Sequence, residues 1–371
     1  MGRSRMNITM FSDSLVNDYG PSRVPLLLAE ALADTCSVLV VAPRISEGLK
    51  ERIGRVGASA VDLRFRQWSA DSSISYVLDW LLSPVVSSRA DAHLPPESIT
   101  INFSNAILHP SDFWYGMGPV SDAIVDLLPT FEAEYLVLAK LGLPFLNLYD
   151  QMVLEKQARG SKVVVGTSRF MRAVYERRGL RVDEVIPCPI DMRVFRPFDD
   201  PGEDYVVAYM GKETETAPLI DLANAGVHLK LFGAKAKSIP MELQVQKTVE
   251  ILPRVSDEEL AKVYSGALVT VFPFSTEPFG YVPVESMACG TPVVTYRKQG
   301  PAETVVDGVT GWLAESPSEL IAKSLNLWKQ GTIPKETRSA CAHHATRFDF
   351  REVGRQWTEL FRSRKTELGH R

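Results

Sequence analysis

Strand-like and helix-like segments alternate along this chain, and the alternation recurs in two successive series. The first series opens with an apolar strand at residues 6–11, an amphipathic helix at 21–34 and a second strand at 37–43. Further strands of this series are predicted at 98–104, 145–150 and 162–168. Strands that alternate with helices pair in parallel, because each helix carries the chain back along the sheet. The pattern predicts an α/β fold.

The second series follows a polar linker with Pro and Gly at residues 199–204. Strands predicted at 205–210 and 228–233 enclose a helix at 217–226, and the series runs to a strand at 312–314. A chain of 371 residues is long for a single hydrophobic core. Two domains are therefore predicted.

The C-terminal tail has the pattern of an amphipathic helix. Its apolar residues recur at helical spacing, at Phe350, Val353, Trp357, Leu360 and Phe361. Such a stripe favours packing against a core, so we expect the tail to be helical and partly buried.

Composition is that of an ordinary globular protein. Apolar residues make up 45% and charged residues 23%, and the formal net charge of −4 gives no sign of nucleic-acid binding. The four cysteines are far apart without a C-x-x-C pair, so neither a zinc site nor a disulfide framework is indicated. No apolar run reaches the ~18 residues that span a bilayer, and the first residues lack the apolar core of a signal peptide. A cytoplasmic location is expected.

The segment from Phe274 to Gly290, FSTEPFGYVPVESMACG, combines two carboxylates with a turn and a helix start. Pro283 fits only the first turn of a helix, and Gly290 fits the position just after its end. The helix is therefore predicted to begin near Gly280 or Tyr281. Its first N–H groups lack intrahelical partners and carry the positive end of the helix dipole, which suits a diphosphate.

The two glutamates of this segment fall on different sides of the predicted phosphate position. Glu285 lies about four residues into the helix, roughly 6 Å along its axis, which matches the offset of ribose hydroxyls from a bound phosphate. Glu277 precedes the turn, on the side where a sugar would hang. The spacing fits a nucleoside diphosphate sugar, although a glutamate early in a helix is often only a favourable partner of the dipole.

These residues resemble the E-x7-E element of retaining glycosyltransferases of family 4, which have the GT-B fold. The resemblance continues upstream through residues 249–274 and downstream through 290–320, where Glu303 matches the glutamate of a Gly-Pro-x-Glu loop; in all, it covers about a third of the chain well. It implies two Rossmann-like, doubly wound domains facing across a cleft. The first would span residues 1–198, completed by the C-terminal helix at 349–371, and the second 199–348.

The resemblance also implies roles for individual residues. Glu277 would hold hydroxyls of the donor sugar, Glu285 those of the ribose, and Lys212 the diphosphate. Gly20 stands in the place of a glycine-rich loop near the diphosphate, although it is equally explained as a turn glycine. The implied donor-binding set is Gly20, Arg254, Val255, Pro278, Phe279, Gly280, Tyr281 and Glu285, with the backbone at Arg254 and Val255 against the base. Neither a metal nor a cofactor is expected, because cations and a helix start would neutralise the leaving group.

Several positions depart from the family pattern. The second expected cation of the phosphate site falls at Ala217. The strand predicted at 145–150 ends in Tyr149, where the family often has a histidine, followed by Asp150; both are candidate catalytic residues. The alternative for Tyr149 is an aromatic that only packs at the edge of the cleft. His109 is a further polar candidate, although a lone histidine is more often structural.

The acceptor side carries weaker signals. The aromatic run Phe113, Trp114 and Tyr115 lies near glycines and suggests a mobile loop over a sugar or lipid. Residues 74–86 are apolar and fit a core helix better than an acceptor wall or a shallow membrane contact. The arginines of 169–181 either meet anionic head groups or face solvent.

The function predicted from this resemblance is a retaining, metal-independent glycosyltransferase of the hexosyltransferase class. Its expected partners are a nucleotide sugar and a glycan, lipid-linked or small-molecule acceptor, without nucleic acid, and a peripheral membrane contact is left open. The competing hypothesis is a catalytically weak or inactive nucleotide-sugar-binding subunit of the same fold, suggested by Ala217 and Tyr149. A lesser alternative is another chemistry on the same donor, such as epimerisation.

Overall fold

The computed structural model describes two compact units of the chain. Unit 1 comprises Met1–Pro189 and Phe350–Arg371, and unit 2 comprises Ile190–Asp349. The chain thus leaves unit 1 after residue 189, whereas the sequence divides the domains after residue 198; the domain boundaries stay a prediction. The described residues are 5–364, apart from 17–19, 67–71, 91–94, 96, 129–132, 199–203, 212, 234–238 and 275.

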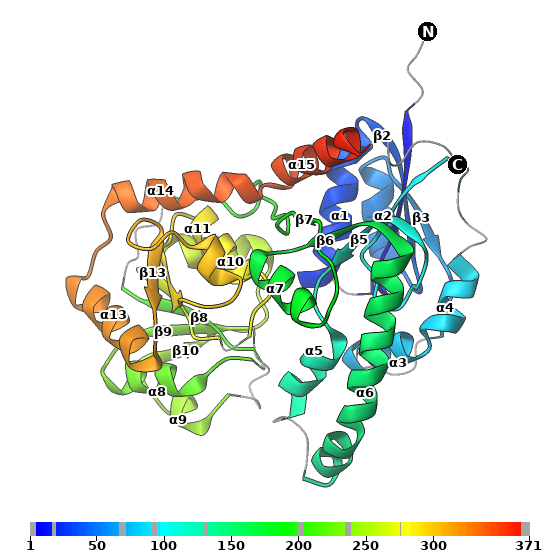
Figure 1. The fold of residues 1–371 in the computed structure, drawn as a ribbon. Helices are drawn as coiled ribbons and strands as arrows, with labels where there is room; N and C mark the ends of the chain where they lie inside the picture. Colours follow the sequence, from blue (N-terminus) through cyan, green and yellow to red (C-terminus); the bar gives the residue numbers. More distant parts are fainter. Residues whose placement is uncertain are drawn as a thin grey trace. The chain divides into compact units, whose positions relative to one another are not determined.

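Unit 1 is built on a parallel sheet of seven described strands in the order β3-β2-β1-β4-β5-β6-β7 (Figure 1). Its interior strands are apolar on both faces, because helices cover both sides of a parallel sheet. The strands are β1 (Met6–Phe11), β2 (Cys36–Ala42), β3 (Ser59–Asp62), β4 (Ile99–Asn102), β5 (Ser111–Gly116), β6 (Ser161–Gly166) and β7 (Glu184–Val185).

The helices of unit 1 include the C-terminal helix α15, which packs beside α1 (Figure 1). All five apolar residues predicted for the stripe of α15 are buried, so the predicted amphipathic helix is confirmed. The helices are α1 (Gly20–Ala33), α2 (Glu47–Arg55), α3 (Ser72–Leu81), α4 (Ser83–Ala90), α5 (Val120–Leu127), α6 (Ala133–Gly160), α7 (Arg169–Arg177) and α15 (Phe350–Ser363). Among the described residues, none of the helices is both long and apolar enough to cross a bilayer.

The strand predicted at residues 145–150 is wrong, because this segment lies inside α6. Leu146, Tyr149 and Val153 recur at helical spacing and pack into one apolar cluster with α3 and α5. A short apolar run is consistent with either a strand or a buried helix, and here the helical contacts on either side decide. The helix continues through Pro144, which lies within it.

The mobile aromatic loop predicted at residues 113–115 is also wrong. Phe113, Trp114 and Tyr115 belong to β5 and are buried. Phe113 contacts Trp357 of α15, and the hydroxyl of Tyr115 donates a hydrogen bond of 2.9 Å to the carbonyl of Ile186. These aromatics therefore join the sheet to the C-terminal helix rather than cover a ligand.

The apolar segment at residues 74–86 forms parts of α3 and α4, as the core-helix interpretation expects. Trp80 and Val86 are fully buried, whereas Leu81 and Val85 keep part of their surface exposed. Its described side chains therefore serve mainly as core.

Unit 2 repeats the α/β plan with a parallel sheet of six described strands in the order β10-β9-β8-β11-β12-β13. The strands are β8 (Val206–Tyr209), β9 (Leu229–Phe232), β10 (Val249–Ile251), β11 (Val269–Phe272), β12 (Val293–Tyr296) and β13 (Gly311–Ala314). The helices are α8 (Thr216–Asn224), α9 (Met241–Gln244), α10 (Asp257–Ser265), α11 (Tyr281–Ala288), α12 (Pro301–Thr304), α13 (Pro317–Gln330) and α14 (Lys335–Ala345). The strands from β8 to β10 extend to one side of β8, and those from β11 to β13 extend to the other, so the strand order switches between β8 and β11. Ligands of such sheets bind at the carboxyl ends of the strands at this switch point.

Candidate functional site

The start of α11 has the geometry that the sequence predicts. The helix begins at Tyr281, with Pro283 in its first turn. Gly280 precedes it with a φ of 93°, in the left-handed region that glycine adopts most easily. Gly290 follows the helix with a φ of 82° and fills the predicted position after its end. The first N–H groups of α11 therefore stand at the turn that follows β11.

The turn before α11 is shaped by Glu277. One carboxylate oxygen of Glu277 accepts hydrogen bonds from the N–H groups of Phe279, at 3.2 Å, and Gly280, at 3.0 Å. Both N–H groups donate to the same oxygen of the carboxylate, which has more than one acceptor position. The turn thus fixes the Glu277 side chain beside the start of α11.

Glu285 lies one turn into α11, and its side chain is largely buried, with 4% of the residue exposed. Burial raises the pKa of the Tyr209 hydroxyl, and the negative charges of Glu213, Glu277 and Glu285 raise it further. All three carboxylates therefore lie near enough to Tyr209, at the carboxyl end of β8, for their charges to act on its hydroxyl. A ligand that matches this arrangement donates hydrogen bonds, as the hydroxyls of a sugar and a ribose do.

Two glycines make room for the ring of Tyr209. A Cβ atom at Gly233 would lie 2.1 Å from the ring, and one at Gly211 would lie 2.5 Å from it. A further contact is Phe274, whose ring stacks on that of Tyr209 with centroids 5.8 Å apart. The ring of Tyr209 thus packs against two glycines near strand ends and against Phe274, in the segment before Glu277.

A second loop closes on the Glu277 turn, and sequence reasoning missed one of its residues, Gln299. Its backbone has a φ of 70°, in the left-handed region, although it is not glycine. The residue is only 9% exposed, and its amide Nε2 donates a hydrogen bond of 2.9 Å to the carbonyl of Phe274. The available signal was the position of Gln299 directly before a Gly-Pro-Ala-Glu sequence. That sequence ends in Glu303, which is exposed on α12.

The remaining donor-side predictions fall at separate places. Arg254 and Val255 follow β10, with Arg254 exposed and Val255 half-buried, directly before Ser256, which caps α10. Gly20 is the first residue of α1, in unit 1. Lys212 lies outside the described residues. Ala217 is exposed in the first turn of α8.

The surroundings of Ala217 are acidic. Glu215 precedes α8, and its carboxylate accepts a hydrogen bond of 2.6 Å from the hydroxyl of Tyr296. Glu213 lies two residues earlier, near Tyr209. The resemblance implies a second cation at position 217. The described residues just before this position instead include the carboxylates of Glu213 and Glu215.

Tyr149 and Asp150 are not at a strand end, which corrects the position predicted for them. The Tyr149 hydroxyl lies 2.9 Å from that of Ser83, and its ring packs edge-on against Trp80, with centroids 5.0 Å apart. Asp150 is fully buried and accepts hydrogen bonds from the N–H and hydroxyl of Ser121, at 3.0 and 2.6 Å. Both side chains hold α6 against its neighbours.

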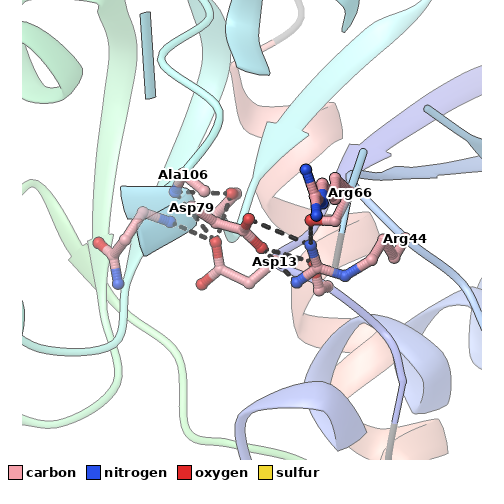
Figure 2. A network of polar contacts seen from close by, with 8 residues as sticks. Asp13, Arg44, Arg66, Asp79 and Ala106 are labelled. Carbon is pink, nitrogen blue, oxygen red and sulfur yellow. Dashed lines mark hydrogen bonds and ion pairs between the residues drawn. The ribbon is translucent and has the colours of Figure 1, made fainter. Parts of the chain in front are cut away.

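The carboxyl edge of the unit 1 sheet instead carries Asp13, which sequence reasoning also missed. One oxygen of Asp13 accepts hydrogen bonds from the hydroxyl of Ser104, at 2.5 Å, and from the N–H groups of Asn105 and Ala106, each at 3.0 Å (Figure 2). Burial raises the pKa of Asp13 to about 6. The available signal was an acidic residue two positions after a predicted strand.

A buried ion pair supports this edge. Arg44 donates to both carboxylate oxygens of Asp79, at 3.2 and 2.6 Å, and to the carbonyl of Arg66 at 2.7 Å (Figure 2). Ser14 donates to Asp79 at 2.9 Å. Together with the bonds of Asp13, these contacts fix the first residues after β1, which lead towards Gly20. His109 lies nearby and stacks on Phe11, with ring centroids 4.7 Å apart.

Comparisons with known proteins match this architecture. Residues 217–348, within unit 2, match the family described as "Glycosyl transferases group 1". The D-inositol 3-phosphate glycosyltransferase of Mycobacterium tuberculosis is 32% identical over 197 residues, which cover 46% of this chain and 40% of that protein. The chain thus spans well under half the length of this curated relative.

Solved structures match nearly the whole chain. Sucrose-phosphate synthase from Thermosynechococcus elongatus aligns with a TM-score of 0.67 and 18% identity, covering 97% of this chain and 100% of that one. HepE of Anabaena in complex with UDP aligns with a TM-score of 0.66 and 17% identity, covering 96% and 100%. At such identities the likeness concerns the fold alone. The predicted fold class, α/β with two Rossmann-like units of the GT-B type, is confirmed.

Proposed function

We propose that this protein is a retaining glycosyltransferase whose unit 2 binds a nucleoside diphosphate sugar. The observation that carries the proposal is the arrangement around the start of α11, where Glu277 stands before the turn and Glu285 stands buried one turn into the helix. The helix start suits the diphosphate, and the two carboxylates suit hydroxyls on either side of it. The match of residues 217–348 to a glycosyltransferase family supports the same assignment.

The proposed division of the donor follows from these positions. Glu277 binds hydroxyls of the sugar, Glu285 binds the ribose, and the backbone at Arg254 and Val255 lies against the base. HepE of Anabaena has been solved in complex with UDP and with UDP-glucose, which supports a nucleotide-sugar donor here. The proposed acceptor is a glycan, a lipid-linked glycan or a small molecule, and the proposed compartment is the cytoplasm.

In the proposed reaction, the bond between the anomeric carbon and the diphosphate oxygen breaks while the acceptor oxygen bonds to the same face of that carbon. The departing phosphate takes the acceptor's proton, so the step needs no separate protein base. The N–H groups at the start of α11 and the ammonium group of Lys212 stabilise the negative charge that develops on the leaving group. No metal is part of this proposal.

The second candidate function is a nucleotide-sugar-binding subunit with little or no turnover. The observation that favours it is the exposed Ala217 beside Glu215 and Glu213, in place of a second cation. With less positive charge near the diphosphate, the leaving group would be less stabilised and the reaction slower, although the carboxylates could still bind the donor.

Two measurements on the purified chain separate these functions. A thermal-shift panel of nucleotide sugars identifies the donor, because a ligand at 100 times its dissociation constant stabilises by about 2.7 kcal/mol. The stabilising donor, incubated without acceptor, is expected to release nucleoside diphosphate slowly, and Glu277→Ala is expected to stop this release. Tight binding with neither hydrolysis nor transfer to any acceptor tested would favour the binding subunit.

The role of the leaving-group cation has its own test. Lys212→Ala is expected to weaken binding of a nucleoside diphosphate much more than binding of the monophosphate, because the proposal assigns the lost charge to the β-phosphate. Addition of EDTA is expected to leave activity unchanged. A clear loss of activity on chelation would contradict the metal-independent mechanism.

A further inference from the structure

Four large apolar side chains lie exposed along one face of α6. The exposed fractions are 67% for Leu141, 76% for Phe145, 62% for Leu148 and 59% for Met152. Their spacing of four, three and four residues places them in a single row on the helix. At 1.5 Å per residue the row is roughly 16 Å long. We refer to these four residues as the α6 row.

The opposite side of α6 is already packed. Leu146, Tyr149 and Val153 join one buried apolar cluster of unit 1, and Leu154 and Ala158 join another. The helix is therefore apolar on two sides, and only one side contributes to the core of the unit. A helix that is apolar all round is normally covered on every side, so the exposed α6 row points to a partner beyond the described residues of unit 1.

Among the charged residues of α6 from Lys140 onward, cations outnumber acids. From Lys140 to Gly160 the helix carries Lys140, Lys156 and Arg159, all exposed, against two acids. One acid, Asp150, is fully buried against Ser121. The other, Glu155, pairs with Arg159 at 2.8 Å. The exposed face therefore combines an apolar row with a net positive charge at its ends.

A second copy of the chain fits this face poorly. In a parallel pair of α6 helices, each lysine would lie beside its own copy. In an antiparallel pair centred on the row, Lys140 of one helix would lie near the Lys156 end of the other. Both arrangements bring like charges together, and the row offers roughly 400–500 Å² per chain, against about 800 Å² per partner in a standard stable interface.

We propose that the α6 row docks on an anionic membrane surface. The four apolar side chains enter the boundary between head groups and acyl chains, while Lys140 and Lys156 extend along the surface to anionic head groups. The first turns of α6 extend past the other helices of unit 1 (Figure 1), and the exposed fractions of the α6 row place it on the surface. This surface differs from the apolar segment at 74–86, whose fully buried residues include Trp80 and Val86.

The test is sedimentation of the full chain with vesicles of phosphatidylcholine alone and of equal parts phosphatidylcholine and phosphatidylglycerol. The protein is expected to bind the anionic vesicles, and to release as salt is raised. The double variant Phe145→Ser with Leu148→Ser is expected to bind at least about tenfold more weakly, because two large apolar side chains are lost. Lys140→Ala with Lys156→Ala is expected to weaken binding to anionic vesicles, by about fivefold for each lysine.

A matched control is available in unit 2. Met241 and Val245 are four residues apart and as exposed as the α6 row, at 66% and 68%. Met241→Ser with Val245→Ser is expected to leave vesicle binding unchanged. Because all four serine substitutions fall on exposed side chains, unchanged thermal unfolding of both double variants would show that they fold.

Three outcomes would overturn the proposal. The first is no binding of the parent chain to anionic vesicles, and the second is equal binding by the parent and the Phe145→Ser, Leu148→Ser variant. The third is a dimer in sedimentation equilibrium that this variant dissociates, which would make a second copy the partner of the row. None of these measurements needs a nucleotide sugar, so their failure is distinct from failure of the proposed function.

Discussion

The N–H of Gly300 donates a hydrogen bond of 3.0 Å to the main-chain carbonyl of Glu277. This hydrogen bond joins the loop after β12 to the turn before α11. The backbones of the two segments lie close together at this point. A Cβ atom at position 300 would lie 2.4 Å from the carbonyl oxygen of Pro278 and 2.6 Å from backbone atoms of Phe279. The side chain proposed to bind the donor sugar is thus held by a loop that approaches closely only because residue 300 is glycine.

Gly300→Ala is therefore expected to displace the Glu277 turn and weaken donor binding. The added methyl group meets backbone atoms, which cannot move aside as a flexible side chain can. We expect at least a tenfold rise in the dissociation constant of the donor, equivalent to about 1.4 kcal/mol, measured by calorimetry. Gly48→Ala is the control, because no atom lies within 4 Å of the added Cβ in α2. Equal behaviour of the two variants would contradict the role of the close contact.

Variants of Gln299 separate an effect on the geometry of the site from an effect on the stability of the chain. Gln299→Gly relieves the left-handed backbone but removes the amide bond to Phe274, and Gln299→Asn tolerates the same backbone with a side chain too short to reach. Both variants are expected to unfold at or near the parent's temperature. Both should nonetheless lose kcat/KM for the donor while they bind the bare nucleoside diphosphate normally. Parent values of kcat and KM in both variants would mean that the amide bond positions nothing.

The local geometry of α11 could be predicted from sequence because it depends on adjacent residues. Pro283 and Gly290 restrict where a helix can begin and end, and the structure confirms both boundaries. The apolar spacing of α15 likewise predicts a buried helix, because five residues on one face recur at a regular interval. Such patterns are visible within a short window of sequence.

Contacts between distant residues could not be predicted in this way. Asp13 is held by Ser104, Asn105 and Ala106, about ninety positions later, and nothing near Asp13 indicates that pairing. The segment at 145–150 was misassigned as a strand, because a run of six residues does not reveal that α6 continues on both sides. The strand that follows β4 in the chain is β5, which ends at Gly116. Tyr149 and Asp150 therefore do not stand at the end of a strand, where the sequence analysis predicts them.

The two glutamates of the site are expected to differ in what they bind. Glu277→Gln should reduce turnover of the nucleotide sugar and leave binding of the nucleoside diphosphate nearly intact, because Glu277 faces the sugar in the proposed function. Glu285→Gln should weaken both, since the ribose belongs to both ligands. Each lost hydrogen bond to a charged group is expected to cost about 1.5–3 kcal/mol. Calorimetry with the nucleotide alone decides, and equal losses in the two variants would exclude this division.

The Asp13 carboxyl gives the chain an expected dependence of stability on pH. Its pKa in the folded chain is about 6, raised from an ordinary value of 3.8 by burial. Between these two values the folded chain holds a proton that the unfolded chain has released. The contribution of Asp13 to the free energy of unfolding is therefore greatest below about pH 4, falls as the pH rises towards 6 and stays at the lower level above it. The Asp13 contribution to this fall is about 2–3 kcal/mol, at 1.36 kcal/mol per pKa unit.

Asp13→Asn removes the charge and keeps an oxygen that accepts from Ser104, Asn105 and Ala106. Relative to the parent, the variant is expected to gain stability at pH 7.5 and to gain much less at pH 4, where the parent carboxyl is already protonated. Urea unfolding at the two pH values measures the difference. The control is Asp34→Asn, an exposed acid whose loss should change stability little at either pH. If Asp13→Asn shifts stability by the same amount at both pH values, the burial of the parent's Asp13 charge is not the cause of the shift.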